Sequence, residues 1–134
     1  MDLIDRKKIN NIQILGYISG ESKYEILSKS IANIVPSKCY ENCPIIIIEC
    51  LRMGIPVISN NLGAIPEFIR DRYNGFIYNY KDLNSLKKLI LTMYNMNKGE
   101  LLLMHNNCME SYFNLFDIDK NFKIIDRVYK STYK

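Results

Sequence analysis

Short apolar runs alternate with segments of helical spacing along this chain of 134 residues. Apolar and β-branched runs predict strands at residues 12–18, 31–35, 57–59 and 76–78. Capping residues and apolar positions three or four apart predict helices at residues 23–29, 65–70, 82–93, 101–113 and 117–133. We predict a single α/β domain over residues 1–134, an open parallel sheet that begins with a linker or helix end at 1–10 and ends with a helix at 117–134.

Four consecutive isoleucines at residues 45–48 pose the one difficult local choice. Their β-branched side chains favour a strand by propensity. Pro44, in contrast, suits the first turn of a helix, and Gly54 suits the position just after its end. If residues 31–35 and 54–59 are parallel neighbours, the segment between them is a crossover, which is usually helical. We therefore predict a helix, and its nearly uniform apolar character predicts that it is buried.

Composition narrows the classes of partner. The formal charge of +4 suits an anionic ligand and is too small for a dedicated nucleic-acid-binding domain, so we expect no nucleic-acid partner. The four cysteines follow no Cys-x-x-Cys spacing and the only histidine comes late in the chain, so we expect no zinc and reduced thiols. No apolar run reaches the length of a spanning helix, and we predict a cytoplasmic protein.

The loop after residue 35 and the helix that follows it form the candidate site. Open parallel sheets bind ligands at the carboxyl ends of their strands, where crossover helices begin. Glu41 lies in this loop, and its carboxylate can accept hydrogen bonds from sugar hydroxyls. The backbone N–H groups of Asn42, Cys43 and Ile45 point at the same crevice and suit a diphosphate linked to a sugar.

Glu49 follows Ile45 by one helical turn in an otherwise apolar segment. A buried carboxylate is costly unless partners satisfy it. Ribose hydroxyls are one possible set of partners. The alternative is that Glu49 pairs with Arg52 or with a neighbouring helix and that Glu41 is a solvated loop residue, and spacing alone favours this alternative.

The ordered motifs of this region resemble a known family. The matching positions are Pro36, Ser37, Glu41, Asn42, Pro44, Glu49, Gly54, residues 56–59, Gly63, Pro66 and Glu67. They are similar to the C-terminal, nucleotide-sugar-binding domain of retaining GT-B glycosyltransferases of family 4, also called glycosyl transferases group 1, with its E-x(7)-E motif in register. Residues 14–16 resemble the upstream "flG" strand of that family and residues 74–76 its downstream "nG" turn.

The resemblance implies a fold, an activity and roles for single residues. It implies a Rossmann-like sheet, the C-terminal half of a GT-B fold, here N-terminally truncated. Glu41 would contact the donor hexose as the candidate catalytic residue, Asn42, Cys43 and Ile45 would hold sugar or phosphate, and Glu49 would bind the ribose. Tyr17 and Ile18 would border the base. The donor would be a UDP-, GDP- or ADP-sugar, and neither a metal nor another cofactor is expected.

Two departures from the family set further expectations. Nothing before Asn10 matches the family's Gly-Arg…Lys-Gly segment, whose basic pair neutralises the diphosphate. Asp117 and Asp119 spell an Asp-x-Asp motif, but their place before a helix favours capping. Without the basic pair, and without the family's N-terminal domain to form a cleft that excludes water, we expect little or no transferase activity from this chain alone.

Two readings of the whole protein follow. The first is part of a split or truncated transferase that needs an N-terminal GT-B domain, on a separate chain or missing here, and a glycan or lipid acceptor. The second is a non-catalytic nucleotide-sugar-binding or scaffold module. Basic and aromatic residues at 117–134 fit peripheral contact with an anionic membrane surface, although a solvated helix face or a helix packed on another domain is the alternative.

Overall fold

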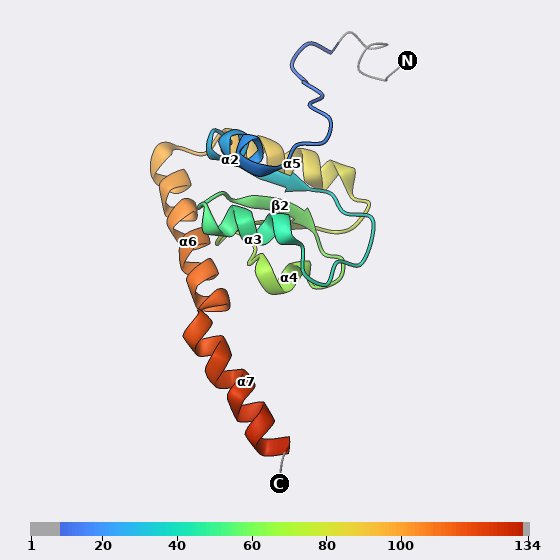
Figure 1. Cartoon of the computed structure of the whole chain (residues 1–134). Helices are drawn as coiled ribbons and strands as arrows, with labels where there is room; N and C mark the ends of the chain where they lie inside the picture. Colours follow the sequence, from blue (N-terminus) through green and yellow to red (C-terminus); the bar gives the residue numbers. More distant parts are fainter. Residues whose placement is uncertain (1–8, 133–134) are drawn as a thin grey trace.

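The computed structural model describes residues 9–132. The predicted linker or helix end therefore lies largely outside the described residues, as do the last two residues of the predicted C-terminal helix. The elements in chain order are α2 (Gly20–Ser28), β1 (Asn33–Val35), α3 (Ile45–Arg52), β2 (Val57–Asn60), α4 (Ile65–Phe68), β3 (Gly75–Tyr78), α5 (Leu83–Tyr94), α6 (Lys98–Phe116) and α7 (Ile118–Thr132) (Figure 1).

The three strands form one parallel sheet in the order β1-β2-β3. Ile58 at the centre of β2 is in register with Ile34 on one side and Phe76 on the other. Helix α3 lies in the connection between β1 and β2, and α4 lies in the connection between β2 and β3. The parallel pairing of β1 with β2 confirms the prediction, and it places the carboxyl ends of all three strands at one edge of the sheet.

The isoleucine segment is a helix, as predicted. It begins after Pro44 and is followed by Gly54, whose φ of +73° is a backbone conformation that glycine adopts without strain. Its burial, however, is one-sided: Ile47 and Leu51 are fully buried, whereas Ile45 is 69 % exposed. The expectation of a helix buried all round was therefore wrong, because the apolar packing of α3 against β2 and α6 covers one side of the helix.

Helices cover both faces of the sheet, as predicted. Val57 of β2 belongs to a cluster that includes Ile47 of α3 and Cys108 of α6. The next residue, Ile58, points to the opposite face and joins a second cluster that includes Met93 of α5. In Figure 1, α3 and α4 accordingly lie on one side of the sheet and α5 on the other. All four residues of β2 are buried, as expected for the central strand of a layered α/β fold.

Residues 12–18 do not form the predicted strand. They have neither helix nor strand hydrogen bonding, and Ile14 and Tyr17 are 64 % and 94 % exposed. A strand needs a neighbouring strand for its N–H and C=O groups, and within residues 9–132 the sheet contains only β1, β2 and β3. The β propensity of the segment is therefore not realised.

The last two helices follow each other almost without a break. α6 is longer at both ends than the predicted helix at 101–113. It starts earlier because Asn97 and Glu100 form a capping box there. Asp117 accepts a hydrogen bond of 2.7 Å from the backbone N–H of Lys120, which confirms capping as the role of that aspartate. α7 leads away from the sheet (Figure 1). Among the described helices, none combines the length and the apolar character that crossing a membrane requires.

Candidate functional site

The loops that follow β1 and β2 are tied together at the carboxyl edge of the sheet. Asn60, the last residue of β2, is 1 % exposed. Its Nδ2 donates to the carbonyl of Ser37 at 2.6 Å, and its Oδ1 accepts from the N–H of Leu62 at 3.0 Å. One buried amide thus fixes the start of each loop relative to the other.

A second contact between these loops holds the backbone of Glu41. The N–H of Ala64 donates to the carbonyl of Glu41 at 2.8 Å. Gly63 has a φ of +59°, and a Cβ at this position would overlap the backbone of Glu41. Only glycine therefore fits both the turn and the close approach.

The side chain of Glu41 is half-buried at this edge. Its Oε1 accepts a hydrogen bond of 2.7 Å from the hydroxyl of Ser37. Glu41 is therefore not the freely solvated loop residue of the alternative reading, and its carboxylate has a fixed partner.

The amino end of α3 follows Glu41 directly. Pro44 is the N-cap residue and supplies no side-chain cap; its carbonyl accepts from the N–H of Ile47 at 2.9 Å. The first N–H groups of a helix lack partners within the helix. The side chains of Asn42, Cys43 and Ile45 are exposed here. The predicted donor groups thus lie beside Glu41 at the carboxyl edge of the sheet.

Glu49 lies farther along α3 and contacts α2. Lys23 Nζ is 2.6 Å from Oε1 and 2.7 Å from Oε2 of Glu49, and the Tyr24 hydroxyl donates to Oε1 at 2.9 Å. The hydrogen bonds from Lys23 lower the pKa of the Glu49 carboxyl, and those to Glu49 raise the pKa of the Lys23 ammonium. Of the structural partners considered for Glu49, the neighbouring helix is therefore the one found.

Glu49 also lines an open hollow of about 370 Å³ together with Tyr24, Arg52 and Met53. Within the described chain the two glutamates have separate partners, Ser37 for Glu41 and residues of α2 for Glu49. Tyr17 and Ile18 lie just before α2, the helix that carries Lys23 and Tyr24.

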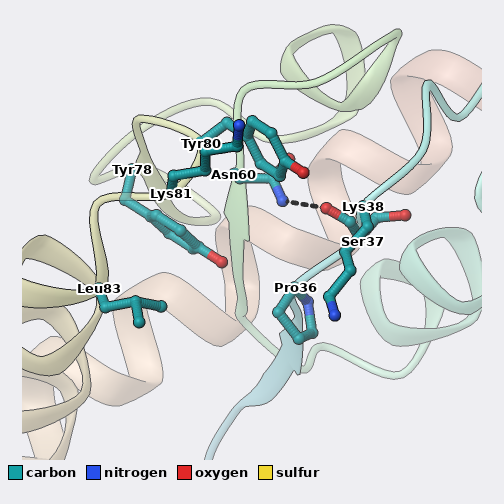
Figure 2. Close-up of a pocket in the computed structure, with 8 residues that line it drawn as sticks. All are labelled: Pro36, Ser37, Lys38, Asn60, Tyr78, Tyr80, Lys81 and Leu83. Carbon is teal, nitrogen blue, oxygen red and sulfur yellow. Dashed lines mark hydrogen bonds between the residues drawn. The ribbon is translucent and has the colours of Figure 1, made fainter.

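A further hollow at the carboxyl edge adds residues that the sequence did not mark as site residues, beside Pro36 and Ser37 of the ordered motif. It has a volume of about 240 Å³, and the side chains around it come from the ends of all three strands (Figure 2). They are Pro36, Ser37, Lys38, Asn60, Tyr78, Tyr80, Lys81 and Leu83. Their signal in the sequence is positional, because each lies at or within five residues of the end of a predicted strand.

Comparison with known families identifies the chain. The family model described as "Glycosyl transferases group 1" matches residues 2–107. The chain belongs to this family. The match spans the sheet, the Glu41 loop and α3, so the family predicted from the ordered motifs is confirmed.

Curated relatives of this family member are considerably longer. An uncharacterized 41.2 kDa protein in the cps region of Klebsiella pneumoniae is 24 % identical over 89 residues, which cover 66 % of this chain and 25 % of that protein. A UDP-Gal:α-D-GlcNAc-diphosphoundecaprenol α-1,3-galactosyltransferase of Escherichia coli is 27 % identical over 105 residues, which cover 78 % of this chain and 26 % of the enzyme. The chain therefore spans about a quarter of these relatives.

Solved structures agree with the fold. Sucrose-phosphate synthase of Thermosynechococcus elongatus matches with a TM-score of 0.81 and 20 % identity, over 98 % of this chain and 33 % of that one. The Anabaena protein HepE in complex with UDP matches with a TM-score of 0.82 and 19 % identity, over 96 % of this chain and 35 % of that one. HepE has also been solved with UDP-glucose. These similarities confirm the predicted fold class, a Rossmann-like α/β fold with a parallel sheet and helices on both faces.

Proposed function

We propose that this chain is the donor-binding part of a retaining glycosyltransferase and binds a nucleotide-diphosphate sugar at the carboxyl edge of its sheet. The observation that carries the proposal is the placement of Glu41. The chain belongs to this family, the Glu41 backbone is held against the Gly63–Ala64 turn, and Glu41 directly precedes the amino end of α3. The complexes of HepE with UDP and UDP-glucose support a nucleotide-sugar ligand for this fold.

The amino end of α3 is the proposed diphosphate site. Its unpartnered N–H groups and partial positive charge attract an anion. During transfer the bond between the sugar and the diphosphate breaks and negative charge grows on the departing diphosphate, so donors already aimed at this position stabilise the transition state. Asn42, Cys43 and Ile45 supply the backbone N–H groups in this proposal, without a metal ion or another cofactor.

Glu41 is the proposed contact to the donor hexose. Its Oε1 already accepts from Ser37, which leaves Oε2 and the remaining lone pairs for sugar hydroxyls. The Glu41 backbone is fixed and one of its carboxylate oxygens already has a partner, so the side chain needs little reorganisation when the sugar binds. Glu41 is accordingly the proposed catalytic residue.

Glu49 is the proposed ribose ligand, with Tyr17 and Ile18 bordering the base. Its carboxylate stays ionised through the contact with Lys23, and an ionised carboxylate is the stronger acceptor for the two ribose hydroxyls. The hollow beside Glu49 and Tyr24 gives a ribose room to approach.

The acceptor in this proposal is a glycan or a lipid-linked sugar, and the E. coli relative, by its name, acts on a diphosphoundecaprenol-linked one. A donor held at the open edge of a single sheet stays in contact with water, which weakens every electrostatic contribution to catalysis. We therefore expect this chain by itself to bind donor and transfer little sugar. Robust turnover by the isolated chain would contradict this expectation.

A binding or scaffold module without catalysis is the second candidate. The full set of partners that Glu49 has in Lys23 and Tyr24 favours it, because those contacts give the carboxylate a structural role as well. If the chain binds the donor but transfers no sugar even after an N-terminal domain is supplied, the non-catalytic module is supported.

Calorimetric titration with nucleotide diphosphates and their sugars tests the proposal. After a panel of UDP-, GDP- and ADP-sugars has identified the base, the matching nucleotide is compared with its 2′-deoxy form. We expect the ribose form to bind roughly tenfold tighter, as a hydrogen bond to a charged group predicts. Glu49→Gln should remove that preference, and Glu25→Gln on α2 should keep it.

The ratio of the two affinities does not depend on the fraction of folded protein, so a destabilised variant remains informative. Equal discrimination by wild type and Glu49→Gln would refute the ribose assignment. Failure of every nucleotide diphosphate to bind would refute the donor site as a whole.

A further inference from the structure

The hollow of about 240 Å³ between the ends of the three strands is a site that the proposed donor contacts leave unused. None of its lining residues belongs to the first turn of α3 or to the surroundings of Glu49. Figure 2 shows side chains from the β1, β2 and β3 ends arranged around one space. Since ligands of parallel α/β sheets bind at this edge, the hollow is in the right place for a second substrate.

Its walls combine apolar surface with free hydroxyl groups. The rings of Tyr78 and Tyr80 and the side chains of Pro36 and Leu83 supply the apolar part. Tyr78 is only 5 % exposed. Neither tyrosine hydroxyl has a hydrogen-bond partner in the described part of the chain, whereas the Asn60 side chain already bonds to Ser37 and Leu62. Aromatic faces next to hydroxyl groups are suited to a sugar ring, whose C–H face is apolar and whose edge is polar.

Two lysines give the hollow its charge. Lys38 comes from the loop after β1 and Lys81 from the loop after β3, and the described residues pair neither of them with a carboxylate. Lys81 adopts a φ of +71°, which is uncommon for a residue with a side chain, and its Nζ lies 5.3 Å from the centre of the Tyr80 ring. The nearby Asp82 is engaged as the cap of α5. Two unpaired ammonium groups at one hollow favour an anionic ligand.

Ser37 connects this hollow to Glu41. It lines the hollow, its carbonyl accepts from Asn60, and its hydroxyl donates to the Glu41 carboxylate at 2.7 Å. A single serine therefore separates the hollow from the residue proposed to contact the donor sugar, which is where an acceptor must lie for its hydroxyl to reach the donor carbon.

We propose that this hollow is an acceptor subsite for an anionic saccharide, a sugar that carries a phosphate or a carboxylate. The tyrosine rings contact the sugar, and Lys38 and Lys81 bind the charged group. As an acceptor site it rests on the proposed function. A sugar phosphate and a uronate share this chemistry and are separated by the test.

Amide NMR titration of the full chain, saturated with the nucleotide diphosphate found above, tests this site. The probes are glucose 1-phosphate, glucuronate and glucose. We expect shifts centred on Lys38, Asn60 and Lys81 with an anionic probe, and binding of glucose at least tenfold weaker. Lys38→Gln with Lys81→Gln should weaken the anionic probe about tenfold or more, while Lys87→Gln on the exposed side of α5 should change nothing.

A response to glucose 1-phosphate alone assigns a phosphorylated acceptor, and a response to glucuronate alone assigns a uronate. A response to both supports the subsite for either anion. If no anionic probe binds while the nucleotide still does, the subsite is refuted and the donor site stands. If the nucleotide displaces the sugar phosphate, the hollow belongs to the donor and the acceptor proposal is overturned. If the nucleotide itself fails to bind, the proposed function fails instead.

Discussion

Residues 12–18 and helix α3 have almost the same apolar character, but α3 is buried on one side and residues 12–18 are largely exposed. The first segment has five apolar residues in seven, and the second opens with four isoleucines. In α3 the side chains of Ile47 and Leu51 are completely buried, whereas in the first segment Ile14 is 64 % exposed. The difference is the neighbourhood: α3 packs against β2 and α6, whereas residues 12–18 pair with no strand of the described sheet. An apolar run thus indicates what a segment can bury, and its neighbours decide what it does bury.

The largest expected effect is the difference in unfolding free energy between a substitution at a buried residue of α3 and one at an exposed residue of 12–18. Leu51→Ala removes packing in the first core cluster, and we expect it to lower the free energy of unfolding by about 2–5 kcal/mol. Ile14→Ala should change it by less than about 0.5 kcal/mol. Urea denaturation followed by circular dichroism measures both. A cost for Ile14→Ala as large as that for Leu51→Ala would mean that residues 12–18 are packed in solution, and the comparison would fail.

The thiols provide a second, smaller contrast between a buried helix side and an exposed loop. Burial raises the pKa of Cys50 to about 11 and that of Cys108 to about 12, whereas Cys39 and Cys43 are exposed. Since only the thiolate reacts, a rise of two units already lowers the reactive fraction about a hundredfold at neutral pH.

Labelling with a maleimide under native conditions, read by mass spectrometry, should therefore modify Cys39 and Cys43 about a hundredfold or more faster than the other two. Leu51→Ala serves as the matched variant, because it loosens the cluster around both buried thiols. Equal rates at all four positions of the wild type would show that α3 and α6 do not shield them.

The centre of the fold follows from local rules that the sequence displays. Pro44 and Gly54 mark the limits of α3, and the need for a crossover between parallel strands decides helix against strand. The same reasoning failed for residues 12–18, because pairing is a long-range property that propensity does not contain. The one-sided burial of α3 likewise depends on where α6 packs, which no local pattern specifies.

The position of the candidate site in the fold could be predicted from the sequence, whereas the side chains that contact each site residue could not. The loop with Glu41 and the helix that follows it lie at the carboxyl edge, as the order of elements predicted. The pairing of Glu49 with Lys23 joins residues 26 positions apart, and helical spacing gave no reason to choose Lys23 over Arg52. The hollow with Lys38 and Lys81 depends on three loop ends meeting in space. Sequence order gives the edge, and tertiary packing gives the contacts.

The Lys23–Glu49 pair should give the smallest effect, and it tests whether α2 holds the flank of α3 in solution. Lys23→Met removes the hydrogen bonds that lower the pKa of Glu49, so this pKa should rise toward its ordinary value. Lys29→Met, which removes the exposed pair with Glu25, is the matched control and should leave the titration of Glu49 unchanged. Carboxyl ¹³C NMR titration measures both variants.

The effect of pH on stability follows from the same shift. Because the folded pKa of Glu49 is lowered, the unfolded chain takes up this proton first as the pH falls. The contribution of the pair is therefore complete above the ordinary glutamate pKa of about 4.3 and is lost as the pH drops through the folded value. Between about pH 5 and pH 3 the wild type should lose more stability in urea titrations than Lys23→Met. Equal losses of unfolding free energy in the two proteins would show that Glu49 titrates as an ordinary surface carboxylate. In that case α2 would not hold the flank of α3 in solution, and α3 would be fixed only by its buried side.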